Sequence, residues 1–229
     1  MPARTPAPWS YSALEDFKNC PFSYYHKRVI KSVKDEGSEH TVWGTRVHEA
    51  FEHRQLHGTP LPMDLMEHED MMKRMDELPG DLYAERKVAL DRERRPCGFD
   101  EHDVVWWRGI IDWTKIDRPN RKARIRDYKT GKMHAKFQQL KLFSIYTFIE
   151  FPDIDEVECK YVWTKFGMVT GETYFREDVP KLWAEFIPDL KQYVEAFKTD
   201  TWQCRPSGLC NGWCPVTTCE HWKPKRRKY

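Results

Sequence analysis

The 229-residue chain lacks any long apolar stretch, since no run approaches the roughly 20 residues that a membrane-spanning helix needs. Its first residues, MPARTPAPW, lack the apolar centre of a secretory signal peptide. The sequence therefore predicts a protein of the cytoplasm without a membrane partner.

Excess charge of one sign is also missing. The chain has 38 Lys and Arg residues against 36 Asp and Glu residues, for a net charge of +2. A uniformly basic surface is excluded, so a DNA partner would have to meet a local patch. Aromatic residues, in contrast, are plentiful, with 10 Trp, 10 Tyr and 12 Phe, which excludes a disordered chain. The length allows one elaborated domain or two small ones.

The seven cysteines are an odd number, and in a reducing compartment they do not predict a disulfide framework. Four of them fall within the sixteen residues from Cys204 to Cys219, with Pro and Gly between them. Such a segment cannot form a hydrophobic core and needs a crosslink, such as a bound metal, to be ordered. The spacing from Cys210 through Cys214 to Cys219 is typical of metal thiolates. The sequence favours a metal or a cluster over unrelated free thiols.

The ligand set of this cysteine site has two alternatives. The four C-terminal cysteines close a local zinc site, with His221 as a substitute ligand. Otherwise Cys20, which lies near the start of the fold, supplies the fourth thiolate of a [4Fe–4S] cluster and fastens the two chain ends. The sequence at the C-terminus, KPKRRKY, adds a basic run that either contacts phosphates or is simply solvated.

A second constellation lies in the stretch from Arg108 to Gln139. Because strand residues alternate faces, Asp127 and Lys129 project to the same side of a predicted strand. Asp112, at the end of a GIID block, reaches that side if its strand lies alongside. Two carboxylates and an ammonium at a strand end predict a divalent-metal site, with the lysine beside it as a proton-transfer group. A salt-bridged hairpin explains these three residues almost as well.

The remaining pattern predicts alternating helices and strands. Pro21 splits a first helix that Ser10 or Ser12 caps, and Gly58 ends a second helix that carries His48 in its early part. A lone helical histidine is more often structural than a ligand, and Glu85 on a strand has an open role. The other predicted elements are a Met-rich helix (63–78), strands (81–90, 103–116, 123–130), a helix (134–149), a hairpin (156–177) and a helix bent or broken near Pro188 (179–199).

Taken together, these blocks resemble the PD-(D/E)XK nuclease superfamily, specifically its RecB-type exonuclease branch. The resemblance runs over residues 9–222, from SYSALEDFKNCPFSYYHKRV and WGTRVHEAFE through GIID and Asp127-Tyr128-Lys129 to Gln139. One early cysteine with three near the C-terminus is similar to the iron–sulfur members, which include CRISPR-associated and AddB-like nucleases. No single block is decisive, but five blocks in this order are specific to the family. The resemblance implies a bacterial source, or a phage member.

The chain departs from the family pattern in three places. The usual closing spacing, Cys-x2-Cys-x5-Cys, has its middle ligand shifted by one residue, at Cys214. Cys204 is an extra candidate ligand. The motif Gln-x-x-x-Tyr reads as Gln139 to Phe143 and so loses its hydroxyl, although Tyr146 lies about one turn further along the same face.

The resemblance implies an α/β fold, with a restriction-endonuclease-like core in which helices flank a central mixed β-sheet. Its N- and C-terminal segments would join at the cysteine site. We expect residues 1–229 to form a single nuclease domain. Its parts would be an N-terminal helical part (9–80), a catalytic core (81–178), a helix (179–200), a Cys-rich cluster segment (201–222) and a basic tail (223–229).

The resemblance also assigns roles at the central site. Lys129 would orient or deprotonate the attacking water, Gln139 would position the site or touch the DNA backbone, and Glu85 would assist by a hydrogen bond or through a metal-bound water. One or two Mg²⁺ or Mn²⁺ ions would be held by four groups, which are His48, Asp112, Asp127 and the carbonyl of Tyr128.

The implied function is a metal-dependent exonuclease that hydrolyses single-stranded DNA or DNA ends in recombination or repair. The alternative is a non-catalytic nucleic-acid-binding module with a structural zinc site. Retention of Asp112, Asp127 and Lys129 together favours the enzyme. Because the chain has no helicase motif, a helicase, recombinase or single-strand-binding partner would be a separate chain.

Overall fold

The computed structural model describes residues 5–34 and 39–225, so the last four residues of the predicted basic tail lie outside the described residues. The chain divides into two compact units, one of residues 37–185 and the other of residues 1–36 together with 186–229. No helix among the described residues is long and apolar enough to cross a membrane.

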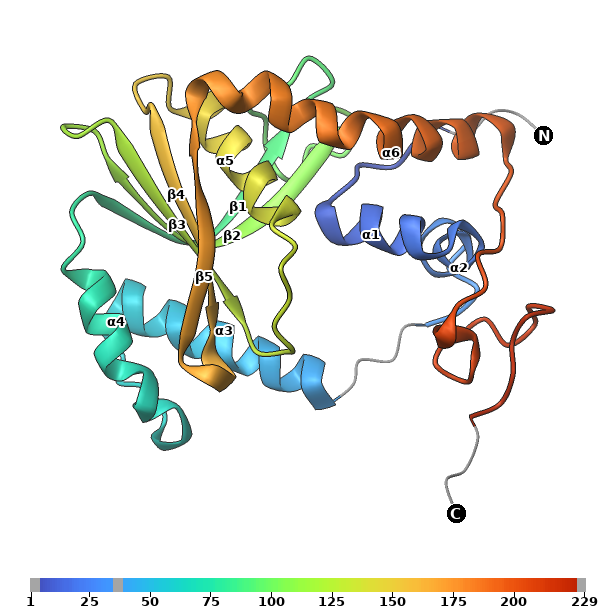
Figure 1. The fold of residues 1–229 in the computed structure, drawn as a ribbon, viewed down its shortest axis with the longest axis horizontal. Helices are drawn as coiled ribbons and strands as arrows, with labels where there is room; N and C mark the ends of the chain where they lie inside the picture. The colour runs from blue at the N-terminus through green and yellow to red at the C-terminus, as the bar shows by residue number, and fades with distance from the viewer. Residues whose placement is uncertain (1–4, 35–38, 226–229) are drawn as a thin grey trace. The chain divides into compact units, whose positions relative to one another are not determined.

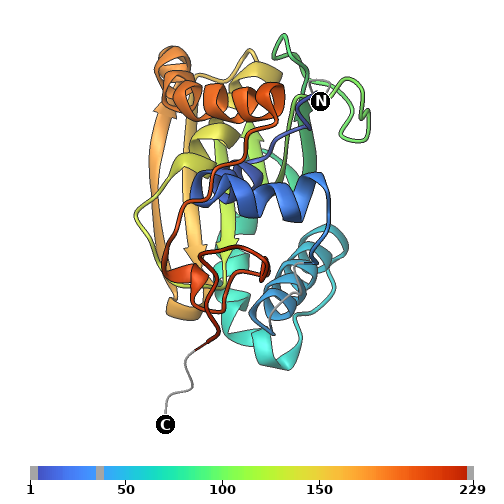
Figure 2. The ribbon, with the colours of Figure 1, turned by 90° about the vertical axis from the view of Figure 1, so that its right-hand side faces the viewer.

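The first unit, residues 37–185, is built on a five-stranded sheet with its strands in sequence order. Neighbouring strands are antiparallel except β3 and β4, which are parallel and are joined through a helix, as parallel strands require. The predicted mixed sheet is therefore confirmed (Figure 1), and β5 lies at one edge of it (Figure 2). The strands are β1 (Asp81–Leu90), β2 (Trp107–Asp117), β3 (Lys122–Lys129), β4 (Glu156–Trp163) and β5 (Met168–Phe175).

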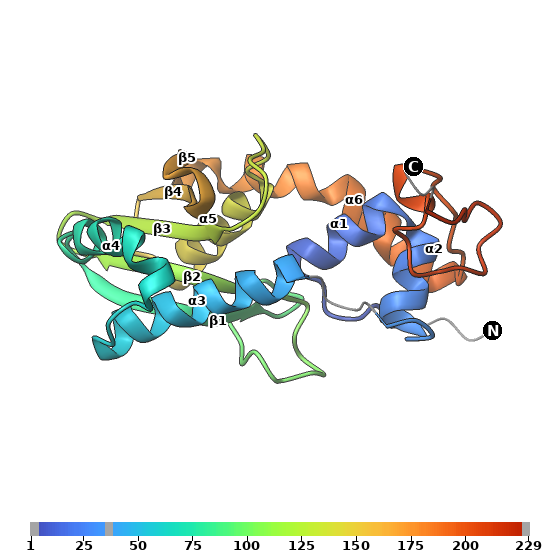
Figure 3. The ribbon, with the colours of Figure 1, turned by 90° about the horizontal axis from the view of Figure 1, so that it is seen from below.

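One face of this sheet is covered by α3 (Glu39–His57), a 3₁₀ turn (Met63–His68) and α4 (Glu69–Asp76). Gly58 follows α3 with a positive φ of 67°, so the predicted helix end is confirmed. The Met-rich segment is a 3₁₀ turn followed by a helix rather than one helix, and α3 runs beside β1 (Figure 3). The buried cluster on this face comprises Val47, Phe51, Leu61, Leu65, Met72, Met75, Trp113, Tyr128 and Val162.

The opposite face is covered by α5 (Gln138–Glu150), the helix that joins β3 to β4. Phe143 is only 2% exposed, and a Cβ added at Gly109 on β2 would lie 2.9 Å from its ring. The position that loses the family's tyrosine hydroxyl is therefore a packing position under the sheet. The predicted helix start at His134 is wrong, because residues 131–136 are all exposed and have no apolar face to bury.

The second unit contains both ends of the chain. Ser10 caps α1 (Tyr11–Asn19) by accepting a hydrogen bond from Ala13 N at 3.2 Å. The chain is extended at Cys20 and then forms α2 (Pro21–Tyr24), so the predicted split at Pro21 is confirmed. Shorter elements are a π-helical turn (Tyr25–Val29) in this unit, 3₁₀ turns at Thr164–Phe166 and Arg176–Asp178 in the first unit, and one at Gly208–Cys210 in the second.

The last long helix, α6 (Val179–Thr199), begins in the first unit and ends in the second. It runs through Pro188 without a break, so of the two predicted alternatives the broken helix is wrong. A proline inside a helix costs about 3 kcal/mol. Burial of large side chains on both sides of Pro188, such as Phe186 and Tyr193, offsets that cost.

Replacing Phe143 by alanine should lower the free energy of unfolding by about 3–5 kcal/mol, because the ring is buried against the sheet and its loss leaves a cavity. Denaturant unfolding measures the difference. Phe166→Ala is the matched control, since that ring is 46% exposed and should cost far less. Equal losses for the two variants would contradict this account of α5.

Candidate metal centre

The site is built where β2 and β3 separate. Their pairing runs from Asp117–Lys122 to Trp113–Arg126 and stops there. At the next position, Asp112 Oδ2 accepts the backbone N–H of Tyr128 at 2.7 Å. The carboxylate therefore replaces a backbone carbonyl, and the sheet can fork without leaving a buried N–H group unpaired.

Side chains from both sides of the sheet reach this fork. Tyr128 and Trp113 belong to the cluster packed under α3. Alternation along β3 places Asp127 and Lys129 on the other side. Where β2 and β3 separate, the carboxylate of Asp112 thus meets both the imidazole of His48 and the backbone N–H of Tyr128.

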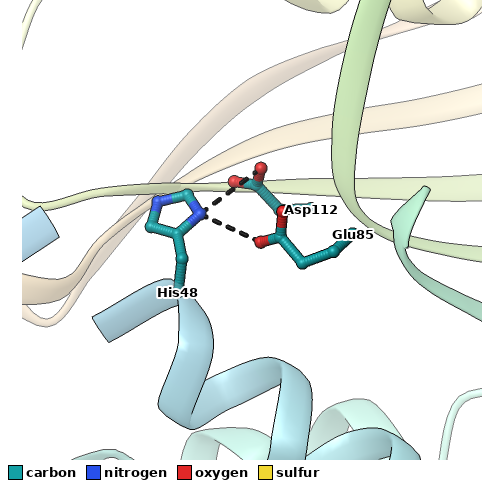
Figure 4. A group of neighbouring side chains, drawn as sticks. All are labelled: His48, Glu85 and Asp112. Carbon is teal, nitrogen blue, oxygen red and sulfur yellow. Dashed lines mark hydrogen bonds and ion pairs between the residues drawn. The ribbon is translucent and has the colours of Figure 1, made fainter. Parts of the chain in front are cut away.

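His48 is the residue that arrives from α3. Its Nδ1 lies 3.1 Å from Glu85 Oε1 and 3.5 Å from Asp112 Oδ1 (Figure 4). Its Nε2 lies 3.2 Å from the carbonyl oxygen of Tyr128. Ligand atoms of His48, Glu85 and Asp112 all lie within 4.8 Å of one another, and no other such trio of His, Cys, Asp or Glu occurs in the described part of the chain. His48 stands midway along α3 rather than in its early part.

Glu85 is held at the site by an unusual backbone. Its φ is +43°, in the left-handed region, while its neighbours Ala84 and Arg86 pair with Trp113 and Ile111 of β2. A non-glycine residue in this region costs about 1–3 kcal/mol. The strand carries this strain at the position whose carboxylate meets His48.

Lys129 and Asp127 form the second part of the site. The Lys129 ammonium forms an ion pair with the Asp127 carboxylate and donates a hydrogen bond to Gln139 Oε1 at 2.9 Å. It also lies 5.0 Å from the ring centroid of Tyr161 on β4. Asp127, predicted as a metal ligand, thus faces Lys129 and is not one of the trio around His48.

The charges at the fork favour a bound cation. Burial lowers the pKa of His48, but the hydrogen bond with Glu85 and the charges of Asp112, Glu85 and Asp127 outweigh this and raise it to about 9. Burial, followed by the charge of Asp127, raises the pKa of Asp112 well above its ordinary value. Hard oxygen donors and one imidazole, gathered where acids repel one another, fit Mg²⁺ or Mn²⁺.

The site opens into a pocket of about 350 Å³. Thr45, Glu49 and Glu52 of α3 line it together with Gly44, His48 and Glu85. Glu52 was missed from the sequence, although its position four residues after His48 places both on one helix face. Helical spacing from the candidate ligand would have found it.

The cysteine residues lie in the second unit. The candidate ligands Cys20, Cys204, Cys210, Cys214, Cys219 and His221 all line one pocket of about 130 Å³. A tetrahedral zinc ion holds its sulfurs about 3.8 Å apart, from Zn–S bonds of about 2.3 Å. Cys204 and Cys219 meet this spacing at 3.7 Å, but no three of the thiols are gathered as closely as a single ion requires.

Comparisons with known proteins agree with this architecture. The family model of the PD-(D/E)XK nuclease superfamily matches residues 8–219. A solved structure from Eubacterium rectale named "Putative exonuclease" is similar to the chain with a TM-score of 0.53 and 10% sequence identity. The similarity covers 93% of this chain and 86% of that one, and it shows the fold. No curated protein matches.

Without metal, the thermal stability of the protein should fall as the pH rises from about 6.5 to about 9. The pKa of His48 is raised from 6.5 to about 9 in the folded state, so its contribution is complete below the lower value and is lost through the higher one. Melting temperatures in EDTA measure the fall, and the His48→Gln variant should lack this component. His53→Gln, an exposed histidine of α3, is the control and should retain it. Identical pH profiles for wild type and His48→Gln would contradict the assignment.

Proposed function

The chain belongs to the PD-(D/E)XK nuclease superfamily, and we propose that it is a divalent-metal-dependent DNA exonuclease that acts on single strands or DNA ends in recombination or repair. The observation that carries this proposal is the convergence of His48, Glu85 and Asp112 at the fork of the sheet. A helicase, recombinase or single-strand-binding protein would act as a separate partner chain.

His48, Asp112, Asp127 and the carbonyl of Tyr128 would hold Mg²⁺ or Mn²⁺. Glu85 would join them, because its carboxylate lies against the same imidazole nitrogen as that of Asp112. When bound, such a cation polarises the scissile phosphate and lowers the pKa of a bound water. The imidazole favours Mn²⁺ somewhat over Mg²⁺.

Lys129 would orient the attacking water and balance the negative charge that develops on the phosphate. Its ammonium is fixed between the Asp127 carboxylate and the amide oxygen of Gln139, so it does not swing freely into solvent. Gln139 then acts by positioning Lys129. A merely DNA-binding module would have no need for this arrangement, which supports catalysis over the non-catalytic alternative.

We also propose that Cys20, Cys210, Cys214 and Cys219 hold a [4Fe–4S] cluster. Each thiolate of such a cluster bonds a different iron atom, so the sulfurs stand further apart than around one ion. This supports a cluster over zinc, since only Cys204 and Cys219 lie at the zinc spacing and both line the pocket with the other thiols. Zinc bound with Cys204 or His221 remains the alternative.

Asp127→Ala should lower metal-dependent cleavage of end-labelled single-stranded DNA by about 100-fold or more, because it releases Lys129 and removes a proposed ligand. Initial rates with Mg²⁺ and with Mn²⁺ measure the loss, and Asp100→Ala, in an exposed turn, is the control. A circular single strand should stay intact if the enzyme needs an end. Absence of metal-dependent cutting by the wild type, or equal cutting by Asp127→Ala, would overturn the assignment.

The purified protein should be brown and contain iron and acid-labile sulfide. Cys214→Ser should lose both, whereas Cys97→Ser, in the other unit, should keep both. Cys204→Ser distinguishes the two ligand sets, because a cluster held by Cys20, Cys210, Cys214 and Cys219 should keep its iron and sulfide in this variant. A colourless protein with one zinc per chain that Cys204→Ser loses would favour zinc instead.

A further inference from the structure

An exposed loop leaves the end of β3 and leads to α5 (Figure 1). Residues 131–136, Gly-Lys-Met-His-Ala-Lys, form what we call the basic loop. Lys129 precedes it by two residues and Gln139 follows it by three, so residues of the proposed site stand at both its ends. We propose that the basic loop binds backbone phosphates of the substrate DNA strand through Lys132, His134 and Lys136. This inference rests on the proposed nuclease function.

The charge of this part of the chain suits a phosphate ligand. From Thr130 to Ile149 the sequence contains no Asp or Glu, and it contains three lysines and one histidine. Lys141 is bound to Glu185 at 2.8 Å, and the side chains of Lys132 and Lys136 are exposed. The neighbouring candidate metal centre gathers three acids, Glu85, Asp112 and Asp127, which repel a phosphodiester unless positive charge is close by. The basic loop supplies that charge beside Lys129.

The basic loop is anchored over the sheet. The ring of His134 packs edge-to-face on Trp163 and Tyr161, with centroid separations of 5.1 and 5.4 Å. These two rings are fully buried, and they belong to the β4 residues in register with Lys129 and Asp127. His134 therefore lies above the strand next to the proposed catalytic residues, at a fixed place rather than on a free arm.

The hydrogen bonding of His134 defines what it offers to a ligand. Its Nδ1 accepts the backbone N–H of Lys136 at 3.3 Å, so the proton of the neutral ring is on Nε2. Burial, followed by the charges of Lys129 and Lys136, lowers the pKa of His134. At neutral pH this residue thus presents an N–H donor without a charge, while the two lysines present charge.

Phosphate contacts of this kind carry no sequence information. An exonuclease that degrades a strand must accept every base in turn, so contacts to the backbone alone suit its task. The loop also differs in kind from a stacking platform, since its only aromatic ring is the anchored His134 and the adjacent Phe137 stacks on Tyr161.

The test is the salt dependence of binding to labelled single-stranded DNA, measured by fluorescence anisotropy with Mg²⁺ in the Asp127→Ala background. The logarithm of the association constant falls linearly with the logarithm of the salt concentration, and each lost phosphate contact reduces the magnitude of this slope by about 0.7 for single strands. The double variant Lys132→Ala/Lys136→Ala should therefore lower the slope by about 1.4. Lys73→Ala/Arg74→Ala, which removes two exposed charges from α4, should leave the slope unchanged.

His134 is tested in the otherwise wild-type enzyme by steady-state cleavage. His134→Ala should raise KM several-fold without a change in the salt slope, because it removes a neutral donor. His134→Gln should restore KM, since its amide reaches the position of Nε2. Melting temperatures within a few degrees of wild type show that the variants are folded.

If the salt slope is unchanged in Lys132→Ala/Lys136→Ala while the wild type cuts DNA, phosphate binding by the basic loop is wrong and the proposed nuclease function is still supported. A lowered slope with a wild type that does not cut supports the loop as a DNA contact and overturns the nuclease function. A slope that falls equally in Lys73→Ala/Arg74→Ala overturns the loop as a specific contact.

Discussion

The hydrogen bond from Tyr128 N to the Asp112 carboxylate is the interaction on which the first unit depends. It ends the pairing of β2 with β3 and still satisfies the backbone group that the separation would expose to an apolar interior. At the resulting fork, His48 of α3 lies beside the carboxylates of Glu85 and Asp112. With an unbroken ladder, the N–H of Tyr128 would pair with a backbone carbonyl, and the Asp112 carboxylate would lose the hydrogen bond that holds it at the site.

This arrangement is costly for folding without a cation. Asp112, Asp127 and Glu85 repel one another in a buried place, and Glu85 adds a left-handed backbone. The hydrogen bond with Glu85 and the charges of the acids raise the pKa of His48 to about 9, so without a metal a protonated imidazole would stand among them as the compensating charge. A metal ion would take over that compensation and release the proton, so occupancy and protonation compete for one place. A strained backbone and repulsion between acids that coincide at one site are typical of a functional site.

Much of this fold follows from local patterns in the sequence. Three predictions depend on only a few adjacent residues, and each is confirmed. Asp127 and Lys129 lie on the same side of β3, a turn joins β2 to β3, and Gly58 follows the end of α3. The backbone of Glu85 could not be read from its strand pattern, because its φ depends on pairing with a distant strand. The helix start at His134 failed for a related reason: periodicity does not show whether a neighbour will bury the residues.

In the second unit, the proposed cluster would add to contacts that the two chain ends already make. Hydrogen bonds of their own join the two chain ends there, since Phe22 N donates to Gln203 O at 3.2 Å and the Arg205 guanidinium donates to Lys18 O at 2.7 Å. These two bonds hold Cys20 beside Arg205, whose backbone N–H points to the Cys20 sulfur at 3.4 Å. Beyond that point the only helical turn before Cys219 is Gly208–Cys210. The proposed cluster would therefore serve less to bring the ends together than to strengthen the turns between Cys204 and Cys219, where hydrogen bonds such as that from Cys214 N to Leu209 O already order the chain.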